Sequence, residues 1–87
     1  MAAGLPLCLA DNCQPGIRYC GYNLLNRGNY LEQINEALIA ANQPTDTSHV
    51  RDSFFLCTGG PGGEITFKTY CQKGCHDGGN DKNDWCN

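Results

Sequence analysis

The chain has 87 residues, of which 40% are hydrophobic and 17% charged, and this composition excludes an intrinsically disordered protein. A formal net charge of −3 disfavours nucleic acids and anionic membranes as partners, and it weighs against a cationic membrane-lysing peptide. No stretch approaches the roughly 20 consecutive apolar residues that span a bilayer, so we expect a soluble protein without membrane insertion.

The length allows one domain, over residues 1–87, and its first part is rich in loops. Residues 1–12 are expected to be poorly anchored. Pro15-Gly16 is a turn signal, and the β-forming residues after it predict a strand over residues 17–22. The apolar run near the N-terminus is too short for the core of a signal peptide, so we expect a mature segment whose secretion signal has been removed.

Residues 29–42 carry the clearest helical pattern in the chain. Hydrophobic residues recur there at intervals of three and four positions, and polar residues occupy the opposite face. The hydrophobic positions are Leu31, Ile34, Leu38 and Ala41. Asn29 is the predicted N-cap, Glu32 lies three residues further on as in a capping box, and Pro44 closes the far end. The sequence therefore predicts one amphipathic helix, which carries no cysteine.

A β-hairpin is predicted after this helix. Residues 45–48 are polar and are expected to form a surface loop. Residues 53–57 and 64–70 are rich in β-forming side chains, and the Gly-rich residues 58–63 between them have the composition of a turn.

The second strand of this hairpin has alternating faces. Ile65, Phe67 and Thr69 alternate with more polar residues, which predicts one face toward the helix and one wetter face. If the turn is symmetric about Pro61, Cys57 lies opposite residue 65. These elements predict an α+β fold, in which one amphipathic helix packs on a small antiparallel β-sheet and disulfides staple the domain.

Seven cysteines in so short a chain indicate a disulfide-rich domain in an oxidising compartment, so we expect the protein to be secreted and extracellular. Loss of one such bond typically costs about 2–5 kcal/mol, which is a large part of a small domain's stability. Six cysteines are expected to pair: Cys13, Cys20, Cys57, Cys71, Cys75 and Cys86. Cys8 is the predicted odd thiol, because it lies nearest to the poorly anchored end.

The spacing leaves the pairing of these cysteines open. Cys8 and Cys13 could instead close a local loop and leave another cysteine unpaired, or the odd thiol could link two chains. Residues 72–87 are rich in Gly, Asn and Asp and would be disordered without Cys75 and Cys86, so we expect disulfides to tie this segment to the sheet.

Several residues resemble parts of a chemical site without completing one. Cys71, Cys75 and His76 are close in sequence, but a zinc site needs a matching second pair of ligands. A catalytic Cys/His pair would need a spare thiol, so His76 and His49 are interpreted as solvated loop residues. The acidic segment 77–84 lacks the register of an EF-hand, and its Asp77, Asp81 and Asp84 are read as turn formers. We therefore predict no catalytic residues, no cofactor and no metal ion.

The aromatic residues are the better indication of a binding surface. Trp85 lies in an otherwise polar segment, and it either packs on the core or stands out as an anchor for a partner. Packing is the more common outcome for so large a side chain in a small protein, so we expect it here. The same reading applies to Arg18, Tyr19, Tyr22 and Tyr30.

The pattern of cysteines, aromatics and glycines resembles a group of small cysteine-rich secreted proteins of filamentous fungi. The motifs that carry the resemblance are Tyr19-Cys20-Gly21-Tyr22-Asn23-Leu24-Leu25, Gly28, Tyr30, Cys57, Cys71, Gly74-Cys75-His76-Asp77-Gly78-Gly79 and Asp84-Trp85-Cys86. They cover roughly residues 13–86, and Cys8 lies outside them. The resemblance implies a secreted protein of a plant-associated fungus, of the kind that includes candidate effectors and elicitors, and it brings no catalytic residue.

From these observations we expect a secreted, non-enzymatic, effector-like or elicitor-like protein that binds a host or cell-surface protein as a monomer. Two alternatives remain open. One is an inhibitor of an extracellular hydrolase, with the 59–63 hairpin tip or the 76–84 loop as the inserted element. The other is an antimicrobial or killer-type toxin, which the acidic charge disfavours.

Overall fold

The structure, a computed structural model, describes residues 13–60 and 62–87. The predictions of a poorly anchored N-terminus and of an odd Cys8 fall on residues 1–12, outside the described residues. In chain order the described elements are β1 (Arg18–Cys20), α1 (Gly21–Arg27), α2 (Leu31–Ala40), α3 (Thr47–Asp52), β2 (Ser53–Gly59), β3 (Glu64–Tyr70), β4 (Cys75–His76) and β5 (Trp85–Cys86).

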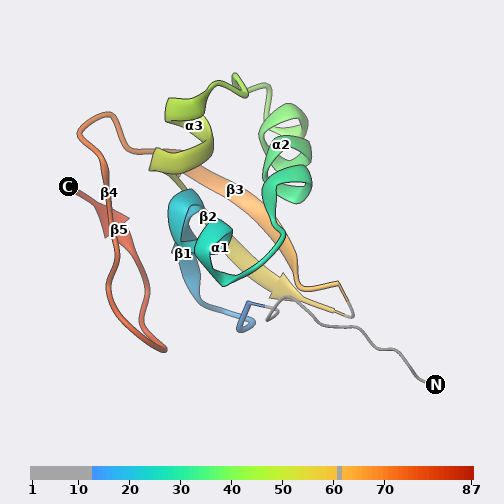
Figure 1. The fold of residues 1–87 in the computed structure, drawn as a ribbon, viewed down its shortest axis with the longest axis vertical. Coiled ribbons are helices and arrows are strands. Elements are labelled where there is room, and N and C mark those ends of the chain that lie inside the picture. The colour runs from blue at the N-terminus through green and yellow to red at the C-terminus, as the bar shows by residue number, and fades with distance from the viewer. Residues whose placement is uncertain (1–12, 61) are drawn as a thin grey trace.

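An antiparallel sheet with the strand order β1-β2-β3 forms the centre of the molecule, and the helices cover one of its faces (Figure 1). Strands β4 and β5 pair with each other in a second, two-stranded sheet beside β1. The predicted fold class is thereby confirmed: this is an α+β domain in which a helix packs on an antiparallel sheet and disulfides join the elements. In the described part of the chain, no helix is long and apolar enough to cross a bilayer.

The predicted hairpin is formed by β2 and β3. Cys57 lies opposite Ile65, as the symmetric turn predicted. Ile65 and Phe67 are half-buried, whereas Thr66 and Lys68 are exposed, so the predicted alternation of β3 is also confirmed. The register shifts between Phe54 and Phe55, which introduces a bulge and ends the regular part of the pairing on that side.

The prediction of a single helix is wrong, because the described residues contain three. Helix α1 begins at Gly21, inside the strand that was predicted for residues 17–22, and it places Leu24 in the core with no exposed surface. Gly21 explains why the chain turns from β1 into α1 at this point. A Cβ atom at this position would lie 1.6 Å from the carbonyl oxygen of Val50, so only glycine lets α1 pack this closely on α3.

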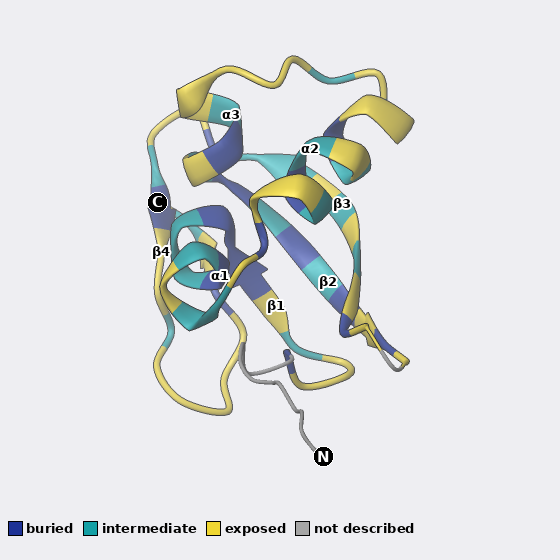
Figure 2. Ribbon diagram, turned by 45° about the vertical axis from the view of Figure 1, so that its right-hand side comes forward, coloured by how far each residue is buried: buried dark blue, intermediate teal, exposed yellow. Residues whose placement is uncertain are grey.

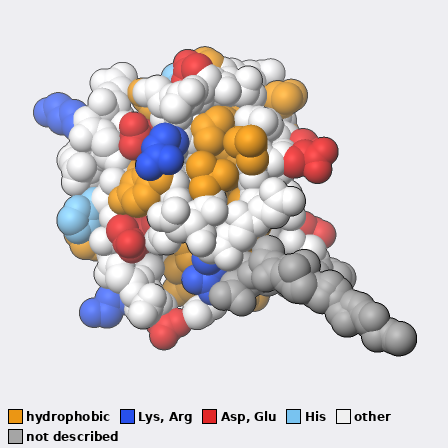
Figure 3. All heavy atoms as spheres, viewed as in Figure 1, with side chains coloured by type: hydrophobic (Ala, Val, Ile, Leu, Met, Phe, Trp, Pro, Cys, Tyr) orange, Lys and Arg blue, Asp and Glu red, His pale blue; other side chains and the backbone are white. Residues whose placement is uncertain are grey.

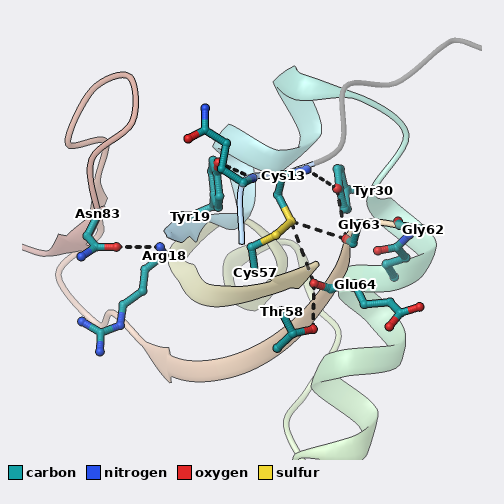
Figure 4. Close-up of a disulfide and its surroundings, with 12 residues drawn as sticks. Cys13, Arg18, Tyr19, Tyr30, Cys57, Thr58, Gly62, Gly63, Glu64 and Asn83 are labelled. Carbon is teal, nitrogen blue, oxygen red and sulfur yellow. Dashed lines mark hydrogen bonds between the residues drawn. A yellow bond between two sulfur atoms is a disulfide. The ribbon is translucent and has the colours of Figure 1, made fainter. Parts of the chain in front are cut away.

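Helix α2 confirms the main predicted helix but begins later than expected. Its N-cap is Tyr30, not Asn29, and no side chain caps it. The Tyr30 side chain points into the fold instead, where its hydroxyl accepts a hydrogen bond from the Cys13 amide at 2.8 Å and donates one to the Gly63 carbonyl at 3.1 Å (Figure 4). The predicted capping box does not form, and the Tyr30 side chain instead ties the start of α2 to the segment before β1 and to the hairpin turn.

Helix α3 begins within the residues that were predicted as a loop, 45–48, and continues through residues 49–52, for which no element was predicted. Asp46 is its N-cap, and the Asp46 carboxylate accepts a hydrogen bond from the His49 amide at 2.8 Å. Val50 is buried against the core. The predicted 45–48 loop is wrong beyond Asp46, because a capping carboxylate and one apolar anchor suffice to hold a short helix within the fold.

Two hydrophobic clusters lie on either side of the sheet. The larger is formed between the helices and the sheet, and Figure 2 shows the buried residues along β2 and on the sides of the helices that face it. Its fully buried side chains include Leu24, Ile34, Leu38 and Phe55. The smaller cluster contains Cys20, Cys71 and Cys75, with Tyr22, Phe54 and Cys86 packed against them.

All six cysteines that were expected to pair are joined in disulfides, and the bonds connect distant parts of the chain. Cys13 is bonded to Cys57, Cys20 to Cys75, and Cys71 to Cys86, with sequence separations of 44, 55 and 15 residues. The first bond ties the segment before β1 to β2 (Figure 4). The other two fasten the C-terminal segment to β1 and to the end of β3, as expected for a segment with so little apolar content.

Candidate functional site

The residues considered as metal ligands are committed to structural roles. Cys71 and Cys75 are both oxidised in disulfides, so neither offers the thiolate that zinc binds. Across residues 13–60 and 62–87, no group of three or more His, Cys, Asp or Glu side chains is arranged to hold a metal ion.

The three aspartates of the C-terminal segment all accept hydrogen bonds from side chains of the N-terminal part: Gln14 donates to Asp81, and Asn23 donates to both Asp77 and Asp84. The Asp84 side chain is only 2% exposed, and it accepts hydrogen bonds from the backbone amides of Cys20 and Gly78, each at 2.7 Å. The Asn23 amide group lies 3.1 Å from the same carboxylate. Asp77 accepts from the Gly79 amide at 2.9 Å, in a local turn. Asp84 is therefore a structural hub that joins β1, α1 and the C-terminal loop.

Trp85 does not pack on the core as expected, and its side chain is 50% exposed. It lies on β5 directly opposite His76 of β4. The two rings are stacked, with centroids 4.4 Å apart and planes inclined by 24°. We call this exposed aromatic pair the Trp85–His76 platform. Its position explains the failed prediction, because the small core cluster beside β4 and β5 is already filled by disulfides and by Tyr22 and Phe54.

The backbone beneath the platform is constrained from several directions. The neighbouring pair, Cys75 and Cys86, is also in register, and each of these cysteines forms a disulfide to another element. Gly78 lies against the indole, since a Cβ atom there would come within 3.0 Å of the Trp85 ring and 2.1 Å of the Asn83 carbonyl oxygen. The exposed indole is therefore held in one orientation by covalent bonds and close packing.

Polar groups surround the base of the platform. The Tyr22 hydroxyl donates a hydrogen bond to the Cys75 carbonyl at 2.9 Å. Burial raises the pKa of Tyr22 above its usual value, and the negative charges of Asp77 and Asp84 raise it further. The phenol thus remains a neutral donor at physiological pH, and it fixes β4 from below.

A second polar cluster lies at α3. His49 is not a solvated loop residue as predicted: its ring stacks on Tyr70 at 3.9 Å, and its Nδ1 lies 2.8 Å from an Asp46 carboxylate oxygen. The Ser48 hydroxyl is paired with the Tyr70 hydroxyl at 2.9 Å. Because Ser48 is directed to Tyr70, these residues do not form the serine–histidine–aspartate relay of hydrolases. These contacts hold α3 against β3.

Two apolar surfaces were not foreseen from the sequence. One is a hollow where α1, α2 and α3 meet, lined in part by Leu25, Leu31 and Val50, and Figure 3 shows hydrophobic side chains gathered on this face. The other is a groove between α2 and β3. The alternation of β3 indicated its inner face, but no local signal shows that β3 is an edge strand.

Comparison with known proteins gives no match: no protein-family model, no curated protein and no solved structure resembles the chain closely enough to be matched.

Proposed function

We propose that this is a secreted, non-enzymatic protein that acts by binding another protein through the Trp85–His76 platform. The observation that carries the proposal is the half-exposed Trp85 ring, stacked on His76 and fastened by two disulfides. Tryptophan is among the residues that contribute most to binding energy at protein interfaces.

The rigidity of the platform supports this function. A partner that binds a fixed aromatic pair loses little side-chain and loop entropy, so more of the contact energy appears as affinity. The exposed Asp77 and Lys82 lie in the adjoining 77–84 loop and provide charged groups around the aromatic centre. An apolar centre within a polar rim is the usual anatomy of a protein interface.

The disulfides and the resemblance support the proposed compartment and partner class. Three disulfides among the described residues favour an oxidising, extracellular environment. The resemblance to small cysteine-rich secreted proteins of filamentous fungi makes a plant-associated fungus the proposed source and a host or cell-surface protein the proposed target. In this role the protein acts as an effector or elicitor.

The experiment is an affinity capture from host extracellular fluid with the wild-type protein and the Trp85→Ala variant, followed by infiltration of both into leaves. We expect Trp85→Ala to lose the captured partner and the leaf response together. Ile39→Ala is the matched control, because Ile39 is a 64% exposed hydrophobic residue on α2, away from the platform. Capture and response that are unchanged in Trp85→Ala would contradict the proposal.

Inhibition of an extracellular hydrolase is a second candidate, and the 77–84 loop favours it. The pairing of β4 with β5 closes the base of this loop, and the bond from the Gly78 amide to Asp84 braces it at 2.7 Å. A braced loop can enter an active-site cleft without much loss of entropy. A panel of proteases and glycosidases tests this function, and a protein that leaves every enzyme uninhibited would exclude it for that panel.

A further inference from the structure

The two edge strands of the main sheet, β1 and β3, differ in whether their outer backbone groups have hydrogen-bond partners. The β1 edge is covered by the C-terminal segment: the Asp84 amide donates to the Arg18 carbonyl at 2.9 Å, and the Arg18 amide donates to the Asn83 side chain at 2.8 Å. In the part of the chain that the structure describes, β3 pairs with β2 alone. Figure 2 shows β3 at the rim of the sheet, next to α2. Among the described residues, one edge is thus closed and the other is open.

The backbone groups at the open edge can be assigned from the hydrogen bonds of β2. The Cys57 amide donates to the Ile17 carbonyl at 2.9 Å, and the Cys57 carbonyl accepts from the Gly16 amide at 2.8 Å. Both groups of Cys57 therefore point away from β3. Because Ile65 lies opposite Cys57, the N–H and C=O of Ile65 point outward to the open edge. Alternation along the strand gives Phe67 the same orientation.

The groove between α2 and β3 lies beside these outward backbone groups. Ala37 and Ala40 of α2 form one wall, and the half-buried side chains of Ile65 and Phe67 form the other. The small alanines leave room above the strand. Toward the Gly-rich turn, the groove continues between two exposed carboxylates, Glu36 and Glu64.

We infer that the open edge of β3 and this groove bind an extended segment of a partner protein, in which apolar side chains alternate with lysine or arginine. The segment would pair with the outward N–H and C=O groups of Ile65 and Phe67 as an added strand. Its apolar side chains would enter the groove beside Ala37 and Ala40. Its basic side chains would lie on the other face of the added strand, where they would meet Glu64, which alternates with Ile65, and Glu36 adds negative charge at the same end of the groove.

Charge decides between a basic partner and a second copy of this chain. Both charged residues that line the groove are acidic. A second copy would present its own β3, which carries one glutamate and one lysine and so offers no net positive charge. The bulge at the exposed Lys68, directly after Phe67, limits regular pairing to the first half of β3, so the bound segment is short. This surface is at the opposite edge of the sheet from the Trp85–His76 platform, so either assignment can fail without the other.

The test is an NMR titration of the ¹⁵N-labelled protein with a synthetic peptide of alternating lysine and valine. A peptide of alternating glutamate and valine is the matched control. We expect the basic peptide to shift the amide signals of Ile65 and Phe67 and to slow their hydrogen exchange about twofold at half saturation, because only the free form exchanges. The acidic peptide should leave both amides unchanged.

Two substitutions on α2 locate the binding site. Ala40→Arg fills the groove and adds a positive charge, and we expect it to weaken the basic peptide about tenfold or more. Ile39→Arg adds the same charge one residue away, at an exposed position outside the groove, and binding should remain within about twofold. Any one of four results would overturn the inference. These are equal binding of both peptides, no effect of Ala40→Arg in a folded variant, shifts confined to another surface, and self-association through β3 without peptide.

Discussion

Asp84 shows how a buried charge can organise a small domain. Its carboxylate is almost completely buried, and it receives three hydrogen bonds from β1, α1 and the 77–84 loop. Hydrogen bonds to a charged group contribute about 1.5–3 kcal/mol each, and removal of the acceptor leaves buried donors without partners. Asp84, which directly precedes Trp85, is thus as important to the platform as the aromatic ring itself, because it holds the backbone that carries the ring.

We predict that Asp84→Ala lowers the free energy of unfolding by about 3 kcal/mol or more, because the amides of Cys20 and Gly78 lose their acceptor. Denaturant unfolding measures the loss. Lys82→Ala is the control, since Lys82 is an exposed charged residue of the same segment, and it should change the stability by less than about 0.5 kcal/mol. Equal effects of the two substitutions would contradict the role given to Asp84.

Ser53 presents the opposite case at the residue scale. Its side chain is completely buried, and its hydroxyl has no hydrogen-bond partner among the described residues. Burial removes water from this hydroxyl, and because no hydrogen bond replaces the lost one, burying it costs free energy. We therefore predict that Ser53→Ala maintains the stability or raises it by about 1 kcal/mol. A loss of more than about 1 kcal/mol in denaturant unfolding would show that the hydroxyl has a partner after all.

At the scale of elements, α3 depends on a single ionised cap. The hydrogen bond from the His49 amide lowers the pKa of Asp46 below its ordinary value of 3.8, and the His49 side chain lowers it further. A lowered pKa in the folded state means that the cap stabilises α3 fully above pH 3.8 and that this contribution is lost as the pH falls through the folded pKa.

We predict that an NMR titration of the Asp46 carboxyl gives a midpoint below that of the same residue in an unfolded peptide. The Asp46→Asn variant, which keeps a capping oxygen but cannot titrate there, should lose this part of the acid dependence of α3. A midpoint equal to that of the peptide would mean that the carboxylate does not cap the helix in solution.

The elements that sequence predicts well here are those whose signal is local. The apolar spacing of α2, the Gly-rich turn and the alternation of β3 depend on neighbouring residues, and all were recognisable. Helices α1 and α3 are short, and tertiary contacts hold them: Gly21 against Val50 for α1, and the buried Val50 for α3. The exposure of Trp85 was missed for a similar reason, because it depends on which side chains fill the adjacent core cluster.

On the scale of the whole molecule, the disulfides join segments that have little apolar surface of their own. The bond from Cys20 to Cys75 closes a loop of 55 residues and holds the C-terminal segment against β1. The bond from Cys71 to Cys86 closes a loop of 15 residues within that segment. In the chain-entropy account, a longer loop restricts the unfolded chain more and stabilises the folded state more.

We predict that the double variant Cys20→Ser with Cys75→Ser loses about 4 kcal/mol, and that Cys71→Ser with Cys86→Ser loses about 3 kcal/mol. Denaturant unfolding followed by Trp85 fluorescence measures both losses and reports the order of the platform at the same time. A double variant as stable as the wild type would show that the disulfide it lacks does not stabilise this fold.

The fold depends on one pairing of its cysteines, in which three disulfides hold the domain and present the Trp85–His76 platform. Peptide mapping by mass spectrometry under non-reducing conditions, after free thiols are blocked, tests it most directly. We expect the linked pairs Cys13 with Cys57, Cys20 with Cys75, and Cys71 with Cys86. Any other pairing of these six residues, or blocked thiols at most of them, would contradict it.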